Sequence, residues 1–373
     1  MTTTGSEEQA WQAAGLYDPE APEAADRRAL LEYLAGEGVT TEQMVYAEEI
    51  GALSSAAGDL RVRPGERISA REVAGRAGID LDLAARVWRA VGLPFADPDA
   101  PVYTDADIES FGSFRVAGEL FGEESVLRFT RMVGASMARI AEGAVTSFLV
   151  DVEGPILEGR RGELALAHAN VQAVSALAAV PPLMDTLFRH HVEAAIRRFR
   201  TARAGDPGAG MARLAVGFVD LVGYTSASQR LAPNELAALV ADFEAKTYDA
   251  VVTSGGRVVK LIGDEVMFVA LGTDAACDAV LTLVELFDES TAVPRAGVAV
   301  GDLLARGGDY YGSVVNLASR IADLAVPREV LVTTAVRDDV TRASGSYRFD
   351  PAGRRLLKGF DDPVELCSLG RAR

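Results

Sequence analysis

The 373-residue sequence has little of several residue types, and each shortage excludes a class of protein. Its two cysteines, Cys277 and Cys367, are too few for a disulfide-stapled domain and lack the spacing of a zinc site. Only 37 Lys and Arg residues stand against 54 Asp and Glu, and the net charge of −17 disfavours a general nucleic-acid-binding surface. Hydrophobic residues still make up 49% of the chain, which is enough for a sizeable core.

The chain also lacks a long uninterrupted apolar run. The N-terminus, MTTTGSEEQAW, is polar and has no apolar segment of the kind that a signal peptide requires. The longest apolar stretch, residues 165–183, is broken by polar side chains and by Pro181 and Pro182, which makes it too polar to span a bilayer. We therefore expect a cytoplasmic protein with no membrane span.

The sequence divides into a leader, a helical half, a linker and an α/β half. Residues 1–24 are acidic and rich in Ala, Glu and Pro, which predicts a loose leader. Residues 25–203 predict an all-α region that ends in a basic helix over 183–203. The Gly- and Pro-rich stretch 204–210 predicts a linker. From 211 to 373, strands alternate with helices, and a closing hairpin is expected from 354–360 and 364–369.

Two aspartates, Asp220 and Asp264, are predicted at the ends of apolar strands, where a buried carboxylate would need a hydrogen-bond partner, an ion-pair partner or a cation. Asp220 ends a strand of otherwise apolar residues, and Asp264 lies in the turn of a hairpin. A carboxylate is costly to bury unless it is paired or binds a cation. Two aspartates that converge at a sheet edge form a hard oxygen site suited to Mg²⁺ with phosphate ligands. For either residue alone, an ordinary turn-forming aspartate is an equally good explanation.

A third segment, GGDYYGSVVNLASRIADL, carries polar residues on a predicted helix that begins near Ser313. Asn316 and Arg320 are four residues apart and share one face of this helix. There, an amide and a guanidinium can hold a ribose oxygen and a phosphate. Asp309 precedes the helix in a Gly-rich loop. In isolation, a solvated amphipathic helix with a loop aspartate explains the segment better.

Together, these segments resemble the catalytic domain of the class III nucleotidyl cyclases. The matching motifs are FVDLVGYT (218–225), KLIGDEVMF (260–268), DYYGSVVNLASR (309–320) and LKGFDDPVEL (357–366), in the order of the family. The resemblance implies an α/β (α+β) fold with a ferredoxin-like, palm-like mixed sheet, preceded by an all-α regulatory domain. It also implies an adenylate cyclase that acts on ATP in a head-to-tail homodimer with two equivalent sites.

The family also assigns roles to six residues of this chain. Asp220 and Asp264 correspond to the ligands of two Mg²⁺ or Mn²⁺ ions per active site. Lys260 and Asp309 correspond to the pair that selects adenine. Asn316 and Arg320 correspond to the catalytic residues that orient the ribose and stabilise charge on the reacting phosphate.

The helical half resembles the regulatory domain of mycobacterial-type, autoinhibited, pH-responsive adenylate cyclases, best over residues 127–148. The resemblance implies a domain that dimerises, inhibits at neutral pH and has been associated with fatty-acid binding. The three histidines, His168, His190 and His191, all lie in this half. Histidine suits a pH switch because its charge changes nearest to neutral pH. The carboxylates of this half are equally good candidates, and each histidine is also explained as a solvated helix residue.

Residues 67–111 have the pattern of a winged helix-turn-helix of the MerR type. A DNA-binding helix needs a basic surface, whereas the expected second helix, DLDLAARVW, starts with acidic residues. DNA binding is therefore disfavoured, and a nucleotide-sensing transcriptional regulator is kept as the alternative function. A diguanylate cyclase shares the palm-like fold, but that family has no place for Lys260, Asn316 and Arg320.

Overall fold

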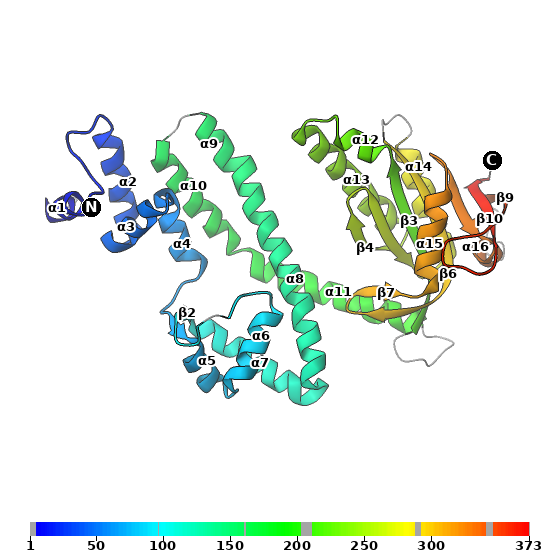
Figure 1. Ribbon diagram of the computed structural model, residues 1–373, viewed down its shortest axis with the longest axis horizontal. Coiled ribbons are helices and arrows are strands. Elements are labelled where there is room, and N and C mark those ends of the chain that lie inside the picture. Colours follow the sequence, from blue (N-terminus) through cyan, green and yellow to red (C-terminus); the bar gives the residue numbers. More distant parts are fainter. Residues whose placement is uncertain are drawn as a thin grey trace. The chain divides into compact units, whose positions relative to one another are not determined.

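The computed structural model describes residues 5–95, 97–159, 162–202, 211–287, 292–340 and 346–372 (Figure 1). The chain forms two compact units, Met1–Phe188 and Arg189–Arg373. The boundary falls within α11 (Val180–Ala202), which corresponds to the basic helix expected over 183–203. The linker expected at 204–210 lies outside the described residues.

The first unit is helical in its described part, apart from one short two-stranded ribbon. A 3₁₀ turn covers Leu53–Ser55, and a π-helical segment, Leu149–Glu153, connects α8 to α9. The helices are α1 (Gly5–Ala13), α2 (Ala24–Gly36), α3 (Thr41–Glu49), α4 (Ala56–Val62), α5 (Ala70–Ala77), α6 (Leu81–Ala90), α7 (Asp105–Phe121), α8 (Glu123–Phe148), α9 (Gly154–Glu158) and α10 (Gly162–Leu177).

The N-terminal segment is not the loose leader that its composition predicts. Residues 5–13 form α1, and Trp11 and Leu16 are only 2% and 4% exposed. Both side chains join a core that includes Leu31 and Leu34 of α2 and Met44 of α3. Burial of a tryptophan removes a large apolar surface from water, and this favours order over the polar composition of the surrounding residues.

Residues 68–103 form the expected helix-turn-helix together with a ribbon. Gly78 ends α5 in the left-handed conformation, and Asp80 caps α6 by accepting a hydrogen bond from the amide of Leu83. The ribbon pairs β1 (Ile68–Ser69) with β2 (Pro101–Tyr103) in antiparallel orientation. Helix α6 packs against α8, where Gly134 leaves room for the backbone of Val91. The second helix of the motif is therefore partly covered by α8.

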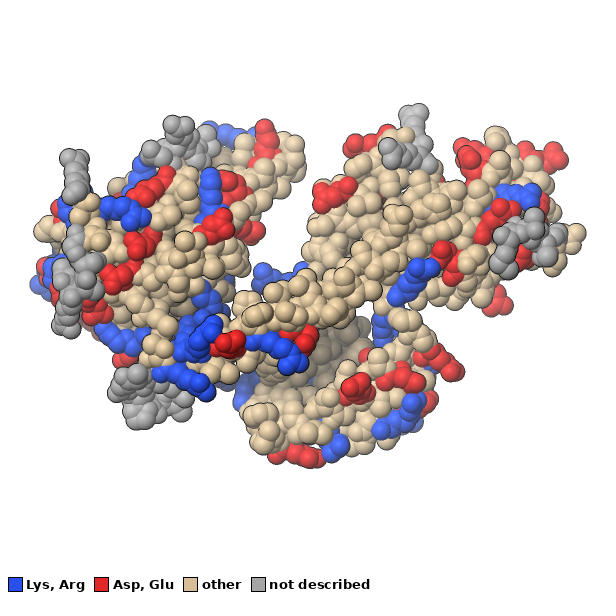
Figure 2. All heavy atoms as spheres, turned by 180° about the vertical axis from the view of Figure 1, so that it is seen from behind, with Lys and Arg blue, Asp and Glu red and all other residues tan. Residues whose placement is uncertain are grey.

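Two helical stretches are long and apolar enough, by length and composition alone, to cross a membrane: Glu123–Glu158 and Gly162–Ala202. In each, only 6% of the most apolar window is buried. Apolar side chains of these stretches are exposed, among them Val145, Val150 and Phe188. Figure 2 shows wide areas without Lys, Arg, Asp or Glu on one face of the molecule. Length and composition are weak evidence for a membrane span, because a helix that packs against another protein has the same features.

The second unit is built on an eight-stranded mixed sheet, which confirms the predicted fold class. The strand order is β4-β5-β3-β6-β8-β10-β9, and β7 pairs with β6. The β6–β8 pair is parallel, and the other pairs are antiparallel. The strands are β3 (Met211–Val222), β4 (Arg257–Ile262), β5 (Glu265–Ala270), β6 (Val293–Arg306), β7 (Asp309–Tyr311), β8 (Val330–Thr333), β9 (Tyr347–Arg355) and β10 (Val364–Arg371).

Helices cover both faces of this sheet. On one face lie α13 (Pro233–Thr253), α14 (Thr273–Leu286) and α16 (Thr334–Val340); on the other lies α15 (Ser313–Leu324), and α12 (Tyr224–Ser228) follows β3. Side chains alternate along a strand, so Asp220 shares the α15 face with Val216 and Phe218. Gly297 of β6 lets α15 approach closely, because a Cβ atom there would clash with the backbone of Ala322.

The closing hairpin is present, but its first strand lies earlier than the sequence predicts. Strand β9 covers Tyr347–Arg355 and pairs with β10, and Arg355 lies opposite Val364. Residues 356–360 instead form the connection between the two strands. Leu357 is buried there, at 3% exposure, and Phe360 packs against the same cluster, whereas Leu356 is 69% exposed.

Candidate active site

The two aspartates predicted to bind metal lie next to each other, where β3 ends and β4 turns into β5. Asp220 of β3 pairs in register with Glu265 of β5. The amide of Leu221 donates a hydrogen bond to the carbonyl oxygen of Asp264 at 3.1 Å. Gly263 has φ of 63°, a conformation that favours glycine, and this lets the tight turn place Asp264 beside β3. The structure thus brings together the two residues that the sequence singled out.

The carboxylates at this edge destabilise one another. Burial raises the pKa of Asp264, and the negative charge of Asp220 raises it further. Burial also raises the pKa of Glu265, and Asp220, Asp323 and Asp264 add to that shift. A raised carboxyl pKa means that the ionised form costs free energy in this environment. A divalent cation would relieve that cost, and carboxylate oxygens are the ligands that Mg²⁺ prefers.

The two aspartates alone would leave most coordination positions of a metal ion to water or substrate. Within the described residues, no group of three or more His, Cys, Asp or Glu side chains has the arrangement of a metal site. Mg²⁺ is usually held by one or two carboxylates together with substrate phosphates and water. The pair Asp220 and Asp264 therefore fits a metal that arrives with a nucleotide.

Arg295, which the sequence analysis missed, is the direct partner of Asp220. It lies opposite Asp220 on β6, and its Nε and Nη2 atoms lie 2.8 Å and 2.7 Å from Asp220 Oδ2. Its Nη1 atom donates to the carbonyl oxygens of Asp323 and Ala325, at 2.7 Å and 3.4 Å. These carbonyls belong to the C-terminal end of α15. One guanidinium therefore connects the Asp220 carboxylate to the helix that carries Asn316 and Arg320.

The residues predicted to read adenine form an ion pair. Lys260 Nζ of β4 lies 2.7 Å from Asp309 Oδ2 of β7, and the two side chains are 38% and 26% exposed. The other carboxylate oxygen of Asp309 accepts a hydrogen bond from the amide of Tyr310 at 2.8 Å. Strand β4 leads from Lys260 to the turn that holds Asp264. One base-reading candidate, Lys260, therefore lies on the strand that leads to one metal-binding candidate, Asp264.

Asn316 and Arg320 lie apart from the sheet, on the exposed side of α15. The buried side of the helix is formed by Ala318, Ile321 and Ala322, as the amphipathic pattern predicts. Arg320 donates to the Asp323 carboxylate on its own helix at 3.1 Å, an exposed contact of modest energy. The side chains of Asn316 and Arg320 are therefore placed to meet something outside the core of this unit.

The three histidines do not form one cluster. His168 of α10 is exposed and makes an edge-to-face contact with Tyr33, with ring centroids 4.2 Å apart. It borders a polar cavity of about 850 Å³ next to Arg27. His190 and His191 are exposed on α11. Arg27 makes ion pairs with Glu48 and Glu163, at 2.7 Å and 3.1 Å.

The fold and this arrangement of residues define the catalytic unit of a class III nucleotidyl cyclase. Residues 209–367 match the family of adenylate and guanylate cyclase catalytic domains. Residues 12–196 match the family of adenylate cyclase regulatory domains. The two matches cover most of the chain in the order that the sequence predicts.

Curated relatives match this chain across its regulatory and catalytic regions. The chain is 35% identical to an uncharacterized protein of Mycobacterium tuberculosis (strain H37Rv), over 98% of this chain and 95% of that protein. It is 33% identical to a pH-sensitive adenylate cyclase of M. tuberculosis (strain CDC 1551), over 93% and 88% of the two chains. It is 36% identical to an adenylate cyclase of Streptomyces coelicolor, over 73% and 71%. The chain belongs to the class III adenylate cyclases that carry an N-terminal regulatory domain.

Proposed function

We propose that this cyclase converts ATP to 3′,5′-cyclic AMP and pyrophosphate at two equivalent sites of a homodimer. The observation that carries the proposal is the Lys260–Asp309 pair, whose side chains on β4 and β7 lie 2.7 Å apart. A lysine can donate to a ring nitrogen of adenine, and an aspartate can accept from its exocyclic amine. Guanine presents the opposite pattern at these positions. A site with these two groups is therefore expected to choose ATP.

The residues divide the work of the reaction, in which the ATP 3′-hydroxyl attacks the α-phosphorus and pyrophosphate leaves. Asp220 and Asp264 would hold two Mg²⁺ or Mn²⁺ ions, which when bound activate the hydroxyl and neutralise the triphosphate. Asn316 orients the ribose. Arg320 donates to the reacting phosphate and stabilises the charge that develops in the transition state.

Assays with ATP and GTP test the proposal directly. The purified chain should form cyclic AMP from ATP when Mg²⁺ or Mn²⁺ is supplied. Binding of ATP without any cyclic AMP would instead favour the nucleotide-sensing regulator.

The exposure of Asn316 and Arg320 supports a site shared between two chains. These residues point away from the core of the unit that holds Asp220, so a second copy can receive them. In a two-fold dimer, each site would combine the aspartates of one chain with the other four residues of its partner. Mixing Asp220→Ala with Asn316→Ala chains should then restore partial activity, because one site of each heterodimer is intact. No recovery, with heterodimers demonstrated, would argue for sites within single chains.

The first unit has two features that support its regulatory role. Arg27 joins α2 to Glu48 of α3 and Glu163 of α10, and its Nε donates to the carbonyl oxygen of Leu16 at 2.9 Å. These ion pairs hold three helices of the unit together. His168 borders the same cavity as Arg27 and is a pH-switch candidate with His190 and His191. The unit also has an apolar cavity of about 300 Å³, lined by Trp88, Phe111 and other apolar residues, which could take an acyl chain.

The structure gives little support to the DNA-binding alternative. Arginines of the helix-turn-helix region are engaged within the chain: Arg71 with Asp99, Arg76 with Glu72 and Asp105, and Arg86 with Glu123 and Glu124. A DNA-binding surface needs arginines that are available for phosphates. We therefore propose that the helix-turn-helix serves for packing within a cytoplasmic enzyme and does not bind DNA.

A further inference from the structure

The end of α11 borders a small basic cavity that the proposed reaction does not use. The cavity has a volume of about 190 Å³ and lies between α11, the turn before β4 and the end of β5. Three arginines line it: Arg197, Arg198 and Arg257. No acidic side chain of the described residues does so. All of these elements belong to the second compact unit.

Two of these arginines have buried donor atoms without a partner. The Nε atoms of Arg198 and Arg257 are two of the four buried side-chain atoms, within the described residues, that lack a hydrogen bond. The Nη2 atom of Arg257 is satisfied, since it donates to the carbonyl oxygen of Gly308 at 2.6 Å. A buried donor left unpaired costs more free energy than a hydrogen bond gains. Two such donors at one cavity indicate that an acceptor belongs there.

The charges of the arginines around the cavity also favour a bound anion. Burial lowers the pKa of Arg257, and the positive charge of Arg198 lowers it further, whereas Tyr310 and the Asp309 carboxylate raise it. Arg197 is partly neutralised by Glu193, at 2.7 Å. Among the described carboxylates, none makes an ion pair with Arg198 or Arg257. Two guanidinium groups thus repel each other across a space that an anion would fill favourably.

We propose that this cavity binds a small tetrahedral oxyanion, such as inorganic phosphate, between Arg198 and Arg257. A guanidinium presents a planar fork of donors that matches phosphate oxygens. The cavity is smaller than the roughly 300 Å³ at which pockets for drug-sized ligands begin, so it suits a free anion better than a nucleotide.

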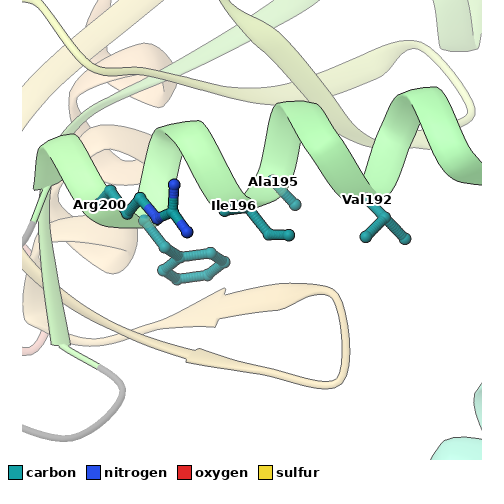
Figure 3. A pocket seen from close by; sticks show the side chains of 5 residues that line it. Val192, Ala195, Ile196 and Arg200 are labelled. Atoms are coloured by element: carbon teal, nitrogen blue, oxygen red, sulfur yellow. The ribbon is translucent and has the colours of Figure 1, made fainter.

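The bound anion would attach α11 to the strand that carries Lys260. On its apolar side, the end of α11 packs against the sheet through Phe199 and Ala202. Phe199 also lines a separate apolar pocket together with Val192 and Ile196, and Arg200 borders that pocket (Figure 3). An anion held by Arg198 and Arg257 would add a polar connection to the second unit. The helix that leads from the regulatory half would thereby be held against the catalytic sheet.

The test is calorimetric titration of the full-length chain with inorganic phosphate at constant ionic strength. Arg198→Gln and Arg257→Gln should each weaken phosphate binding at least tenfold. Arg200→Gln is the matched control, because it makes the same change on the same helix at the other pocket, and it should bind like the wild type. Hydrogen exchange gives a second measurement: phosphate should increase the protection of amides in residues 194–202 in the wild type, and not in Arg198→Gln.

Two results would overturn the proposal. One is the absence of saturable binding up to about 10 mM phosphate. The other is binding that survives both Arg198→Gln and Arg257→Gln but is lost in Arg320→Gln, which would place the anion in the catalytic site. Arg198 lies on a helix surface, so its variant keeps the test valid even if Arg257→Gln does not fold. Because cyclase activity is not measured, the outcome is independent of the proposed function.

Discussion

The two units of this chain differ in how completely each one covers its own apolar surface. In the second unit, helices pack on both faces of the sheet, and core side chains such as Phe243 and Val280 are fully buried. In the first unit, small helical cores coexist with a long helix whose Val133, Met137 and Ile140 are 36%, 39% and 47% exposed. The second unit therefore has a core covered on both sides, although Val252, Val326 and Leu356 are 60%, 61% and 69% exposed on it. The first unit leaves one face of a long helix exposed, which is apolar surface available for a partner.

The largest expected effect tests whether the chemistry resides entirely in the second unit. Asp220→Ala or Asp264→Ala should lower cyclase activity by about 100-fold or more, because loss of a metal ligand removes several kcal/mol of transition-state stabilisation. The measurement is the initial rate of cyclic AMP formation at saturating ATP and metal.

The matched control is Asp242→Ala, which removes a half-exposed carboxylate of α13 that pairs with Lys246, four residues away. It should keep nearly full activity. Retention of more than about a tenth of the wild-type rate by Asp220→Ala would remove Asp220 from the metal site.

The next effect concerns the choice of base. The wild type should prefer ATP over GTP by well over tenfold in kcat/KM, because a polar site rejects a base that leaves its own groups unpaired. Lys260→Ala should reduce this preference, and Lys246→Ala, on the surface of α13, should leave it unchanged. Equal kcat/KM values for the two nucleotides in the wild type would show that Lys260 and Asp309 do not face the base.

A third prediction compares two arginines of the same unit. Arg295 and Asp220 are 24% and 21% exposed, and Arg295 also donates to two backbone carbonyls. Arg295→Gln should therefore lower the free energy of unfolding by about 1–3 kcal/mol. The Arg320–Asp323 pair is 44% and 52% exposed, and Arg320→Gln should change stability by no more than about 0.5 kcal/mol.

Tryptophan fluorescence can show which unit loses stability in Arg295→Gln. The chain's two tryptophans, Trp11 and Trp88, both lie in the first unit, so tryptophan fluorescence follows that unit alone. Circular dichroism follows both units. In urea titrations of Arg295→Gln, the dichroism transition should move while the fluorescence transition stays in place. A shift of fluorescence alone would contradict the assigned role of Arg295.

The sequence was sufficient to predict those parts of the fold and site that depend on local pattern. The strands and helices of the second unit follow from alternating and 3.6-residue periods, and Asp220 and Asp264 stood out as charges in apolar surroundings. Whether these residues bind metal remains a prediction. The proximity of Lys260 and Asp309 followed only from the family resemblance, because 49 residues separate them.

What the sequence did not reveal depends on tertiary contacts. Arg295 is one charge in the strand PRAGVAVG, and its two partners come from β3 and from the end of α15. Trp11 was read as part of a loose leader because its neighbours are polar, whereas its burial depends on α2 and α3. The pattern of residues 354–360 predicts a strand, although residues 356–360 form a connection in which Leu357 is buried. In each case, a distant segment determines the environment of the residue.

The smallest expected effect tests the link between the two units. A fragment of about residues 206–373 contains all six proposed site residues and lacks the first unit and α11. If the first unit restrains the catalytic units, the fragment should be several-fold more active than the full chain at neutral pH. The reason is that a helix shared by both units can bias the population of closed catalytic dimers without touching the chemistry.

The pH profile gives the sharper form of this test. Acidification from about pH 8 to 5.5 should activate the full chain, because histidine changes its charge in this range and its protonation would release the restraint, and the fragment should respond less. Both proteins must be assayed over a range of concentrations, because a weakly dimerising fragment loses activity on dilution alone. Glu48→Gln and Glu163→Gln in the full chain remove the two carboxylates that pair with Arg27, and they test whether these ion pairs contribute to the restraint. Superimposable profiles and equal specific activities would show that the first unit is no pH-linked inhibitor, and ligand binding in its apolar cavity would then be the better explanation for this unit.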